Sequence, residues 1–201
     1  MNRLLVACAA LIPLVSGGAQ SDPLAARSKG RPDAPITLYE MSDFQCPYCR
    51  AFALGTMPAL EQEYISTGKV RLVYINLPLT SLHPNARAAA QVALCAARQD
   101  RFWAVHDLLF RHQDEWAKLP KPSGVLLALG DSAHLDHAAL DACVTANATA
   151  PEVDADAARA RRAGAVSTPT FYIEGGLLEG AAPVTVFRAV LDSIYRAKTG
   201  R

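Results

Sequence analysis

The four-residue motif Cys46-Pro47-Tyr48-Cys49 holds the residues whose types and spacing most clearly indicate chemistry. A Cys-x-x-Cys pair at the junction of a strand and a helix is typical of a dithiol redox site. Cys46 would begin the helix, where unpaired backbone N–H groups and the helix dipole favour a thiolate. Cys49 would lie on the same side, close enough to form a small disulfide ring, and Pro47 suits the first helical turn. We therefore expect Cys46 to be the exposed sulfur that is attacked and Cys49 to be the more buried resolving cysteine.

Two other interpretations of this motif are an inert disulfide and a metal site. Structural zinc sites need four protein ligands, and the sequence contains no second Cys-x-x-Cys pair and no His-x-x-x-His pair. The histidines are scattered along segments that we expect to be mainly helical: His83, His106, His112, His134 and His137. A redox site therefore fits the motif best. It needs neither a metal nor a cofactor, because the disulfide itself carries the two electrons.

Two further features of the sequence fit redox chemistry. Glu40 stands six residues before Cys46 in an otherwise apolar strand, where a buried acid could exchange a proton with Cys49. The alternative interpretation of Glu40 is a carboxylate on an edge strand that faces water. Thr168-Pro169 comes just before a later strand. A cis bond there would turn the chain sharply, although position alone predicts trans, since only about 5–6% of X-Pro bonds in folded proteins are cis.

The elements that would position these residues begin with a β-α-β unit. Residues 20–35 are rich in Ser, Pro, Gly and charge, and we interpret them as a linker. Strand character follows at 36–42, a helix at 46–67 with a kink expected at Pro58, and a second strand at 70–77. Such a unit implies parallel strands joined by a right-handed crossover.

The remainder of the chain alternates between helix and strand. Residues 84–163 are rich in alanine and predict three to five short helices with apolar inner faces. Strand character returns at 170–173 and, after a turn, at 177–180. A final helix is expected over 183–197. One sheet interrupted by a helical insert explains this order better than two independent domains.

Composition limits the classes of protein to consider. The chain has 201 residues, of which 51% are hydrophobic and 19% are charged, with a net charge of +1. These values fit a globular protein with an apolar core and argue against disorder. No window reaches the roughly 18 consecutive apolar residues of a membrane span. The balanced charge and the lack of a basic run argue against nucleic acid as the main partner.

The first 19 residues have the layout of a secretory signal peptide. Arg3 supplies a positive charge, residues 4–15 are mainly apolar, and small residues precede an expected cleavage site near Ala19. Cleavage there would remove Cys8 and leave four cysteines, an even number that suits the oxidising periplasm or another exported location. We therefore expect an exported protein.

Two motifs separated by the helical block make a family recognisable. Residues 44–49 (Phe-Gln-Cys-Pro-Tyr-Cys) and 167–171 (Ser-Thr-Pro-Thr-Phe) resemble those of the DsbA-like thiol-disulfide oxidoreductases of the thioredoxin superfamily. Residues 96–110 also look like part of the helical insert of that family. The resemblance covers roughly residues 33–198. It implies an α/β fold, with a discontinuous thioredoxin-like domain at 36–78 and 164–201 and a helical insert domain at 79–163.

The resemblance also implies roles for single residues. Pro169 would be the cis-proline beside the active-site disulfide, and the Thr168 backbone would pair with an extended substrate. Glu40 matches the buried acid that aids proton transfer at the buried cysteine. Pro47 and Tyr48 would contact the client protein. The best-known strong oxidants of the family carry Pro-His at these two positions, so we expect a less depressed pKa for Cys46 and a less oxidising disulfide.

The predicted function is the introduction of disulfides into reduced or misoxidised client proteins, with a membrane oxidase restoring the disulfide. Disulfide isomerisation or reduction is the nearest alternative, and Thr168 in place of Val before the proline resembles isomerase and reductase relatives. A Cu(I) metallochaperone would use the same thiolates, but the mature chain would hold only Met41 and Met57 and no methionine cluster. A peptide-binding chaperone would use the groove beside Pro169 and would not need Cys46.

Cys95 and Cys143 remain once the motif cysteines are assigned. Both fall on apolar faces of expected helices, so one interpretation is two buried thiols. Because we expect an exported protein, we favour a structural Cys95–Cys143 disulfide, which would close a loop of about 48 residues and contribute about 3–4 kcal/mol in the chain-entropy model.

Overall fold

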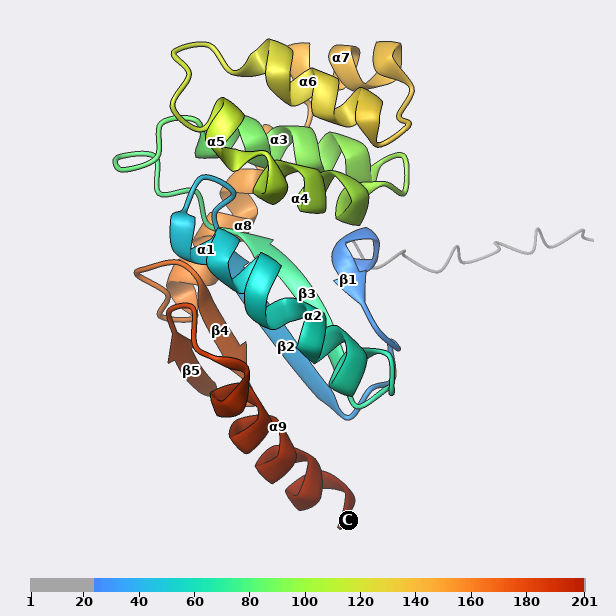
Figure 1. The fold of residues 1–201 in the computed structure, drawn as a ribbon, viewed down its shortest axis with the longest axis vertical. Coiled ribbons are helices and arrows are strands. Elements are labelled where there is room, and N and C mark those ends of the chain that lie inside the picture. Colours follow the sequence, from blue (N-terminus) through green and yellow to red (C-terminus); the bar gives the residue numbers. More distant parts are fainter. Residues whose placement is uncertain (1–23, 201) are drawn as a thin grey trace, which may run out of the picture.

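A computed structural model describes residues 24–200 of the chain (Figure 1). The expected signal peptide and its cleavage near Ala19 lie outside the described residues. Within them, one sheet has the strand order β1-β3-β2-β4-β5. The central strands β2 and β3 are parallel, and the other neighbouring pairs are antiparallel. The strands are β1 (Ser28–Lys29), β2 (Ile36–Ser42), β3 (Val70–Asn76), β4 (Thr170–Ile173) and β5 (Gly176–Glu179).

The two faces of the sheet carry separate layers of apolar side chains. Ile36 and Leu38 on one face of β2 pack with side chains of the helical segment that follows Cys46 and of the last helix. Met41 on the other face packs with Ala157 and Ala160. Because side chains alternate along a strand, Glu40 and Ser42 continue the face of Ile36 and Leu38. The strand therefore points Glu40 toward the layer that contains the Cys49 helix.

Residues 24–35 are more ordered than a linker. A short 3₁₀ turn, η1 (Ala25–Arg27), leads into β1, which pairs with Val73 and Leu72 of β3. Arg27 is buried and forms an ion pair with Asp156. A two-residue strand has too few positions to show alternation, so β1 could not be predicted from the sequence pattern.

The helical segment that follows Cys46 is continuous but not a regular α-helix. Its four stretches are α1 (Pro47–Ala51), the π turn η2 (Phe52–Thr56), α2 (Met57–Leu60) and the π turn η3 (Glu61–Ile65). Pro58 has no N–H to donate to the preceding turn, and that turn widens so that the Met57 N–H donates to the Phe52 carbonyl. The kink expected at Pro58 is thus a π turn just before it. Gly68, at φ +75°, ends the segment in a conformation that favours glycine.

Six helices separate β3 from β4 in the described chain, one more than the expected maximum of five. They are α3 (Ala86–Ala97), α4 (Phe102–Arg111), α5 (Gln113–Trp116), α6 (Ser123–Ser132), α7 (His137–Thr145) and α8 (Ala150–Arg162). The extra element arises because a break at His112 separates α5 from α4. Figure 1 shows α3 to α7 stacked above the sheet, whereas α8 descends behind it. Because α8 packs against β3, it belongs to the layers of the sheet rather than to the stacked block.

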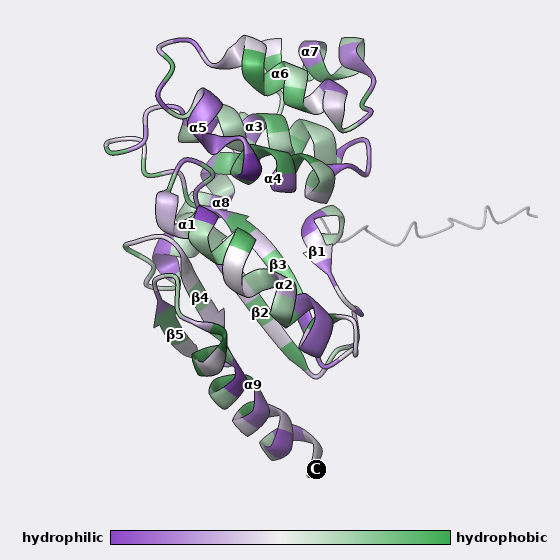
Figure 2. Ribbon diagram, viewed as in Figure 1, coloured by the Kyte–Doolittle hydropathy of each residue, from purple (hydrophilic) through white to green (hydrophobic). Residues whose placement is uncertain are grey.

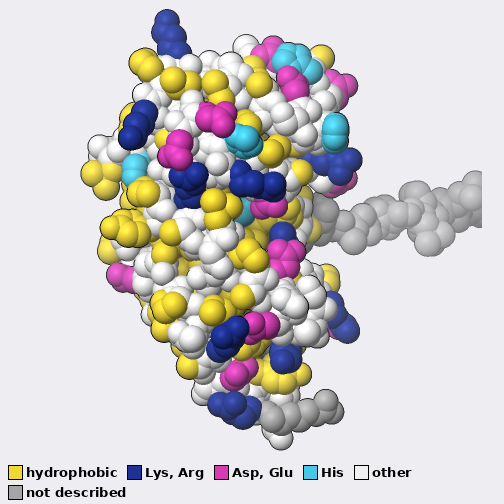
Figure 3. All heavy atoms as spheres, viewed as in Figure 1, with side chains coloured by type: hydrophobic (Ala, Val, Ile, Leu, Met, Phe, Trp, Pro, Cys, Tyr) yellow, Lys and Arg dark blue, Asp and Glu magenta, His cyan; other side chains and the backbone are white. Residues whose placement is uncertain are grey.

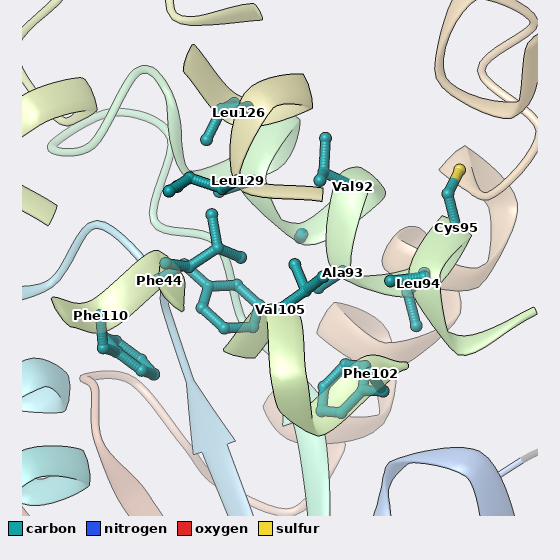
Figure 4. Packing of buried hydrophobic residues seen from close by; sticks show 14 of the residues in the cluster. Phe44, Val92, Ala93, Leu94, Cys95, Phe102, Val105, Phe110, Leu126 and Leu129 are labelled. Carbon is teal, nitrogen blue, oxygen red and sulfur yellow. The ribbon is translucent and has the colours of Figure 1, made fainter. Parts of the chain in front are cut away.

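The core of the helical block reaches down to the redox motif. Figure 4 shows Phe44, from the loop before Cys46, beside side chains of α4 and α6 such as Val105 and Leu129. The same cluster includes Cys46 and Cys49, so the motif lies where the block meets the sheet. In Figure 2 hydrophobic residues concentrate on β2, β3 and α3, as this shared core requires.

The helix α9 (Val184–Thr199) closes the lower part of the sheet. Its Phe187 ring packs against Phe52, with ring centroids 5.5 Å apart, and against Phe171, at 4.9 Å. These contacts join the last helix to the segment that carries the motif. Within residues 24–200, no helix is both long and apolar enough to cross a membrane.

Cys95 of α3 and Cys143 of α7 are joined by a disulfide across 48 residues of sequence. We expect the double replacement Cys95→Ala/Cys143→Ala to lower the free energy of unfolding by about 3 kcal/mol, because the unfolded chain regains the entropy of an open loop. The measurement is urea unfolding in a background with both motif cysteines replaced by serine, so that no other thiol pair changes state. A loss below about 1 kcal/mol would contradict the prediction.

Candidate active site

Cys46 occupies the N-cap position of α1. Its backbone is extended at φ −72° and ψ 125°, and Pro47 follows in the first helical turn. The Cys46 carbonyl accepts the Arg50 N–H at 3.1 Å, which starts the helical hydrogen bonding. The Cys46 sulfur therefore stands at the helix N-terminus, where free N–H groups favour negative charge.

The expectation that Cys46 is exposed is wrong. Cys46 is only 4% exposed, against 0% for Cys49, whereas Tyr48 between them is 66% exposed. The reason is tertiary: Thr168 and Pro169 lie over the motif, and both are buried. The Thr168–Pro169 peptide is cis, as the family resemblance implies. The Cys46 sulfur lies 3.3 Å from the Thr168 carbonyl oxygen, to which the thiol donates when it is protonated, and this contact joins two segments 122 residues apart.

The two motif thiols are free in this structure and differ in acidity. The Cys49 thiol donates to Cys46 and, with smaller help from Thr168 and the amides of Tyr48 and Cys49, lowers the pKa of Cys46 to about 6. Burial and the charge on Cys46 raise the pKa of Cys49 well above its ordinary value. Cys46 is thus the thiolate at neutral pH, and Cys49 retains its proton.

Glu40 lies in a central strand and is completely buried, so the interpretation as an edge-strand carboxylate is wrong. It pairs in register with Tyr74 of β3 and with Phe171 of β4. Neither carboxyl oxygen has a hydrogen-bond partner among the described residues. Burial raises the pKa of Glu40 to about 7, and the Ser42 hydroxyl opposes that rise. Ser42 also lowers the pKa of Cys49, so it lies between the acid and the buried thiol.

The loop before the motif is held by hydrogen bonds of two buried side chains, Asp43 and Gln113, which the sequence analysis did not identify. The buried Asp43 carboxylate accepts the N–H groups of Gln45 at 2.8 Å and Leu79 at 2.9 Å, and it contacts His83 Nδ1 at 2.8 Å. Gln113 of α5 donates to the carbonyls of Phe44 at 2.7 Å and Cys46 at 3.1 Å. Asp43 in a short turn before a helix was the available signal, but its partners come from distant segments.

The structure brings together Glu40, Cys46, Cys49, Thr168 and Pro169, while Tyr48 projects beside them into solvent. Cys95 and Cys143 lie apart in the helical block. Nowhere in residues 24–200 do three or more His, Cys, Asp or Glu side chains gather as they would around a metal ion. The arrangement can hold one thiolate next to one protonated thiol, with an acid of intermediate pKa nearby.

Comparison with known proteins places the chain in a family. The family model described as Thioredoxin matches residues 25–193. The Na(+)/H(+) antiporter NhaA 3 of Salinispora tropica is 33% identical over 174 residues, which is 87% of this chain and 25% of the antiporter. The chain thus spans about a quarter of the length of such antiporter relatives. Disulfide bond formation protein D of Bacillus subtilis is 23% identical over 170 residues, or 84% of this chain and 77% of that protein.

Solved structures agree with the family match. The crystal structure of α-DsbA1 from Wolbachia pipientis superposes with a TM-score of 0.76 at 22% identity, covering 86% of this chain and 92% of that one. At this level of identity the similarity establishes the fold. The chain therefore belongs to the thioredoxin family, and its fold is DsbA-like.

Proposed function

We propose that this protein is an exported thiol-disulfide oxidoreductase that introduces disulfides into client proteins through Cys46 and Cys49. The observation that carries the proposal is the difference between the two thiols. Cys46, at a helix N-terminus, has a pKa of about 6, and the pKa of the buried Cys49 is raised. A low pKa makes Cys46 a good leaving group, and leaving-group acidity speeds exchange.

The reaction begins with the Cys46–Cys49 disulfide. A client thiolate attacks Cys46 Sγ, a client–Cys46 bond forms, and the Cys46–Cys49 bond breaks. Cys49 leaves as a thiolate and takes a proton from Glu40. A second client thiolate then attacks the client sulfur of the mixed disulfide and releases Cys46 as a thiolate. Two electrons pass from the client to the motif, and the client gains one disulfide.

The client would bind across the surface that surrounds Cys46. The Thr168 backbone, next to the Cys46 sulfur, would pair with an extended client segment. Pro47 and the exposed ring of Tyr48 would contact the client on the other side. Reduced proteins would be clients through thiols in extended segments, and misoxidised proteins would be clients through a disulfide that the Cys46 thiolate of the reduced motif attacks. A membrane oxidase would restore the motif disulfide.

The proposal also includes the division of the chain into a signal peptide, a lead-in and two domains. Residues 1–19 would be a signal peptide and 20–35 a lead-in, with export to the periplasm or an equivalent compartment. The thioredoxin-like domain would comprise 36–78 and 164–201, and 79–163 would be the helical insert. The packing of α8 against β3 favours moving the upper boundary of the insert to the start of α8 at Ala150.

The first test is the equilibrium of the motif with glutathione together with the oxidation of reduced ribonuclease A. A reduction potential near about −120 mV, with recovery of ribonuclease activity, would support a disulfide donor. A potential below about −200 mV would favour the second candidate, an isomerase or reductase of the same fold. Tyr48 in place of the histidine of the strong oxidants and Thr168 before Pro169 are the features that favour that candidate.

The residue at position 48 offers a prediction about this potential. We expect Tyr48→His to lower the pKa of Cys46 by about one unit, because a cationic imidazole would stabilise the thiolate. One unit corresponds to about 1.4 kcal/mol, so the disulfide should become about 30 mV more oxidising. Thiolate absorbance and glutathione equilibrium measure the two quantities. Tyr48→Phe is the matched control, and an equal shift in that variant would show that charge is not the cause.

A further inference from the structure

Cys49 must gain and lose a proton in each redox cycle, and the exchange of disulfides does not itself provide a route for that proton. The reaction proposed above delivers a proton to Cys49 in the oxidising half and must remove it when the disulfide is restored. Cys49 and Glu40 are both 0% exposed. A client bound over Cys46 would cover the nearest surface. A proton path to solvent is therefore required elsewhere in the protein.

Four neighbouring buried residues carry polar atoms that lack a hydrogen bond of good geometry among the described residues, and one hydroxyl, that of Ser42, lowers the pKa of both Glu40 and Tyr74. The atoms are both carboxyl oxygens of Glu40, Ser42 Oγ, Tyr74 Oη and His106 Nε2. Buried polar groups in proteins are nearly always hydrogen-bonded, directly or through ordered water. Four unsatisfied residues in one region are therefore a feature that packing alone does not explain.

These residues follow one another from the sheet into the helical block. Glu40 and Tyr74 are direct neighbours across β2 and β3. The Tyr74 ring meets the His106 ring edge-on, with centroids 5.4 Å apart. Burial is the main cause that raises the pKa of Tyr74, Glu40 and Cys49 raise it further, and Ser42 opposes the rise, so the hydroxyl lies in the electrostatic field of the redox site.

His106 then leads to the surface. Its Nδ1 lies 2.9 Å from Asp107 Oδ1, which leaves the unpartnered Nε2 on the interior side of the ring. The Asp107 side chain is 43% exposed. It lines a groove with Lys29, Glu61 and Arg111, and this groove includes neither the motif cysteines nor Thr168. Figure 3 shows the charged side chains that gather on this face between α4 and α2.

The surroundings of His106 make it energetically unfavourable as a purely structural residue, because its Nε2 is buried without a hydrogen bond. The imidazole is fully buried among the rings of Phe44, Phe102, Trp103 and Phe110, with centroids 4.9 to 6.2 Å away. Burial lowers the pKa of His106, so the ring is neutral at neutral pH. A neutral imidazole can accept a proton at one nitrogen while it gives one up at the other. An apolar ring would fill the same space without an unsatisfied nitrogen.

We propose that Tyr74 and His106 form a buried proton relay that connects Glu40 and Cys49 with Asp107 at the surface. This inference rests on the proposed function. In the oxidising half, Asp107 passes a proton from solvent to Nδ1 of His106, and Nε2 releases its proton toward the Tyr74 hydroxyl. Tyr74 accepts that proton while it donates its own toward Glu40 through an intervening water. Glu40 thereby regains the proton that it gave to Cys49, and Tyr74 is never ionised.

The relay resets itself in the other half of the cycle. Restoring the motif disulfide removes the proton from Cys49 to Glu40 and drives the same transfers in reverse. His106 then recovers its first tautomer without a ring flip, which the surrounding aromatic rings would hinder. One proton enters and one leaves per turnover, so charge and protons balance without any other reactant.

The test is the rate at which dithiothreitol reduces the oxidised protein, followed by acid quench and mass spectrometry in H₂O and D₂O. We expect Tyr74→Phe and Asp107→Asn each to slow the reaction at least tenfold, within the range for general acid–base catalysis. The reduction potential and the Cys46 pKa should stay unchanged. Tyr64→Phe is the matched control, because Tyr64 donates its hydroxyl to Asp192 on a distant part of the fold.

A double variant distinguishes a single proton path through both residues from two independent effects on the reduction rate. If both residues serve one path, Tyr74→Phe/Asp107→Asn should be no slower than the slower single variant, and it should lose the solvent isotope effect of the wild type. Rates equal to that of Tyr64→Phe, or slowing that accompanies a changed potential, would overturn the relay. Asp107 is partly exposed, so Asp107→Asn keeps the test valid even if Tyr74→Phe does not fold. A wild-type protein that dithiothreitol cannot reduce at the motif would instead refute the proposed function.

Discussion

Cys46→Ser is expected to abolish disulfide transfer, with a loss of at least about a thousandfold in the ribonuclease oxidation rate. A serine oxygen cannot form the mixed disulfide, and Cys49, completely buried, cannot replace Cys46 as the attacked sulfur. The fold should survive, because the change removes one thiol donor to the Thr168 carbonyl and replaces it with a hydroxyl. Circular dichroism and urea unfolding verify that the variant is folded.

Cys49→Ser is the matched partner of this experiment. The Cys46 thiolate of this variant can attack a disulfide of misoxidised ribonuclease A and release the other client sulfur as a thiolate. Without Cys49 the mixed disulfide cannot be resolved internally, so a covalent complex with this client should accumulate on non-reducing gels. Cys46→Ser should form none. Full biological activity of Cys46→Ser would refute the oxidoreductase and support a peptide-binding chaperone that uses the groove beside Pro169. Stoichiometric Cu(I) binding that survives competition by glutathione would instead support a metallochaperone.

The parts of the fold that the sequence predicts are those with local patterns. The strands at 36–42 and 70–77 and the Cys-x-x-Cys helix between them follow from runs of apolar and β-branched residues and from Pro47 in the first turn. The parts that it misses depend on contacts between distant segments. The strand β1 exists because β3 offers a free edge to Ser28 and Lys29. The π turn η2 is an exception with a local cause, because it forms next to Pro58, which has no N–H to donate.

The site shows the same division. The motif itself identifies Cys46 and Cys49. An acid in an apolar strand and a proline before a strand point to Glu40 and to Thr168-Pro169, and the resemblance to a family assigns their roles. The burial of Cys46 could not be predicted, because the residues that cover it arrive from a segment 122 residues later. Tyr74 and His106 carry no motif, and each looks like an ordinary core position until its partners are known. Only the register of β2 with β3 and the packing of α4 bring them to Glu40.

Glu40 should make the folded protein less stable as the pH rises. Its pKa is raised from 4.5 to about 7 by burial, so the folded state holds a proton that the unfolded state releases. The stabilisation that the protonated Glu40 contributes is fully present below about pH 4.5 and is lost as the pH rises through 7. A pKa shift of this size corresponds to roughly 3 kcal/mol. We expect Glu40→Gln, which cannot ionise, to gain about this much relative to the wild type between pH 4 and pH 8.5.

The measurement is urea unfolding of both proteins across this range with all other conditions held equal. Effects of the other titrating groups, including Cys46, largely cancel in the difference between wild type and variant. Glu63→Gln is a control of opposite sign, because Arg188 holds the pKa of Glu63 below its usual value at the surface. That variant should lose stability relative to the wild type at high pH. A flat difference for Glu40→Gln would mean that Glu40 ionises freely in the folded protein. Its carboxyl would then have no proton to give Cys49 at neutral pH, and the proton-transfer step proposed for it would fail with the stability prediction.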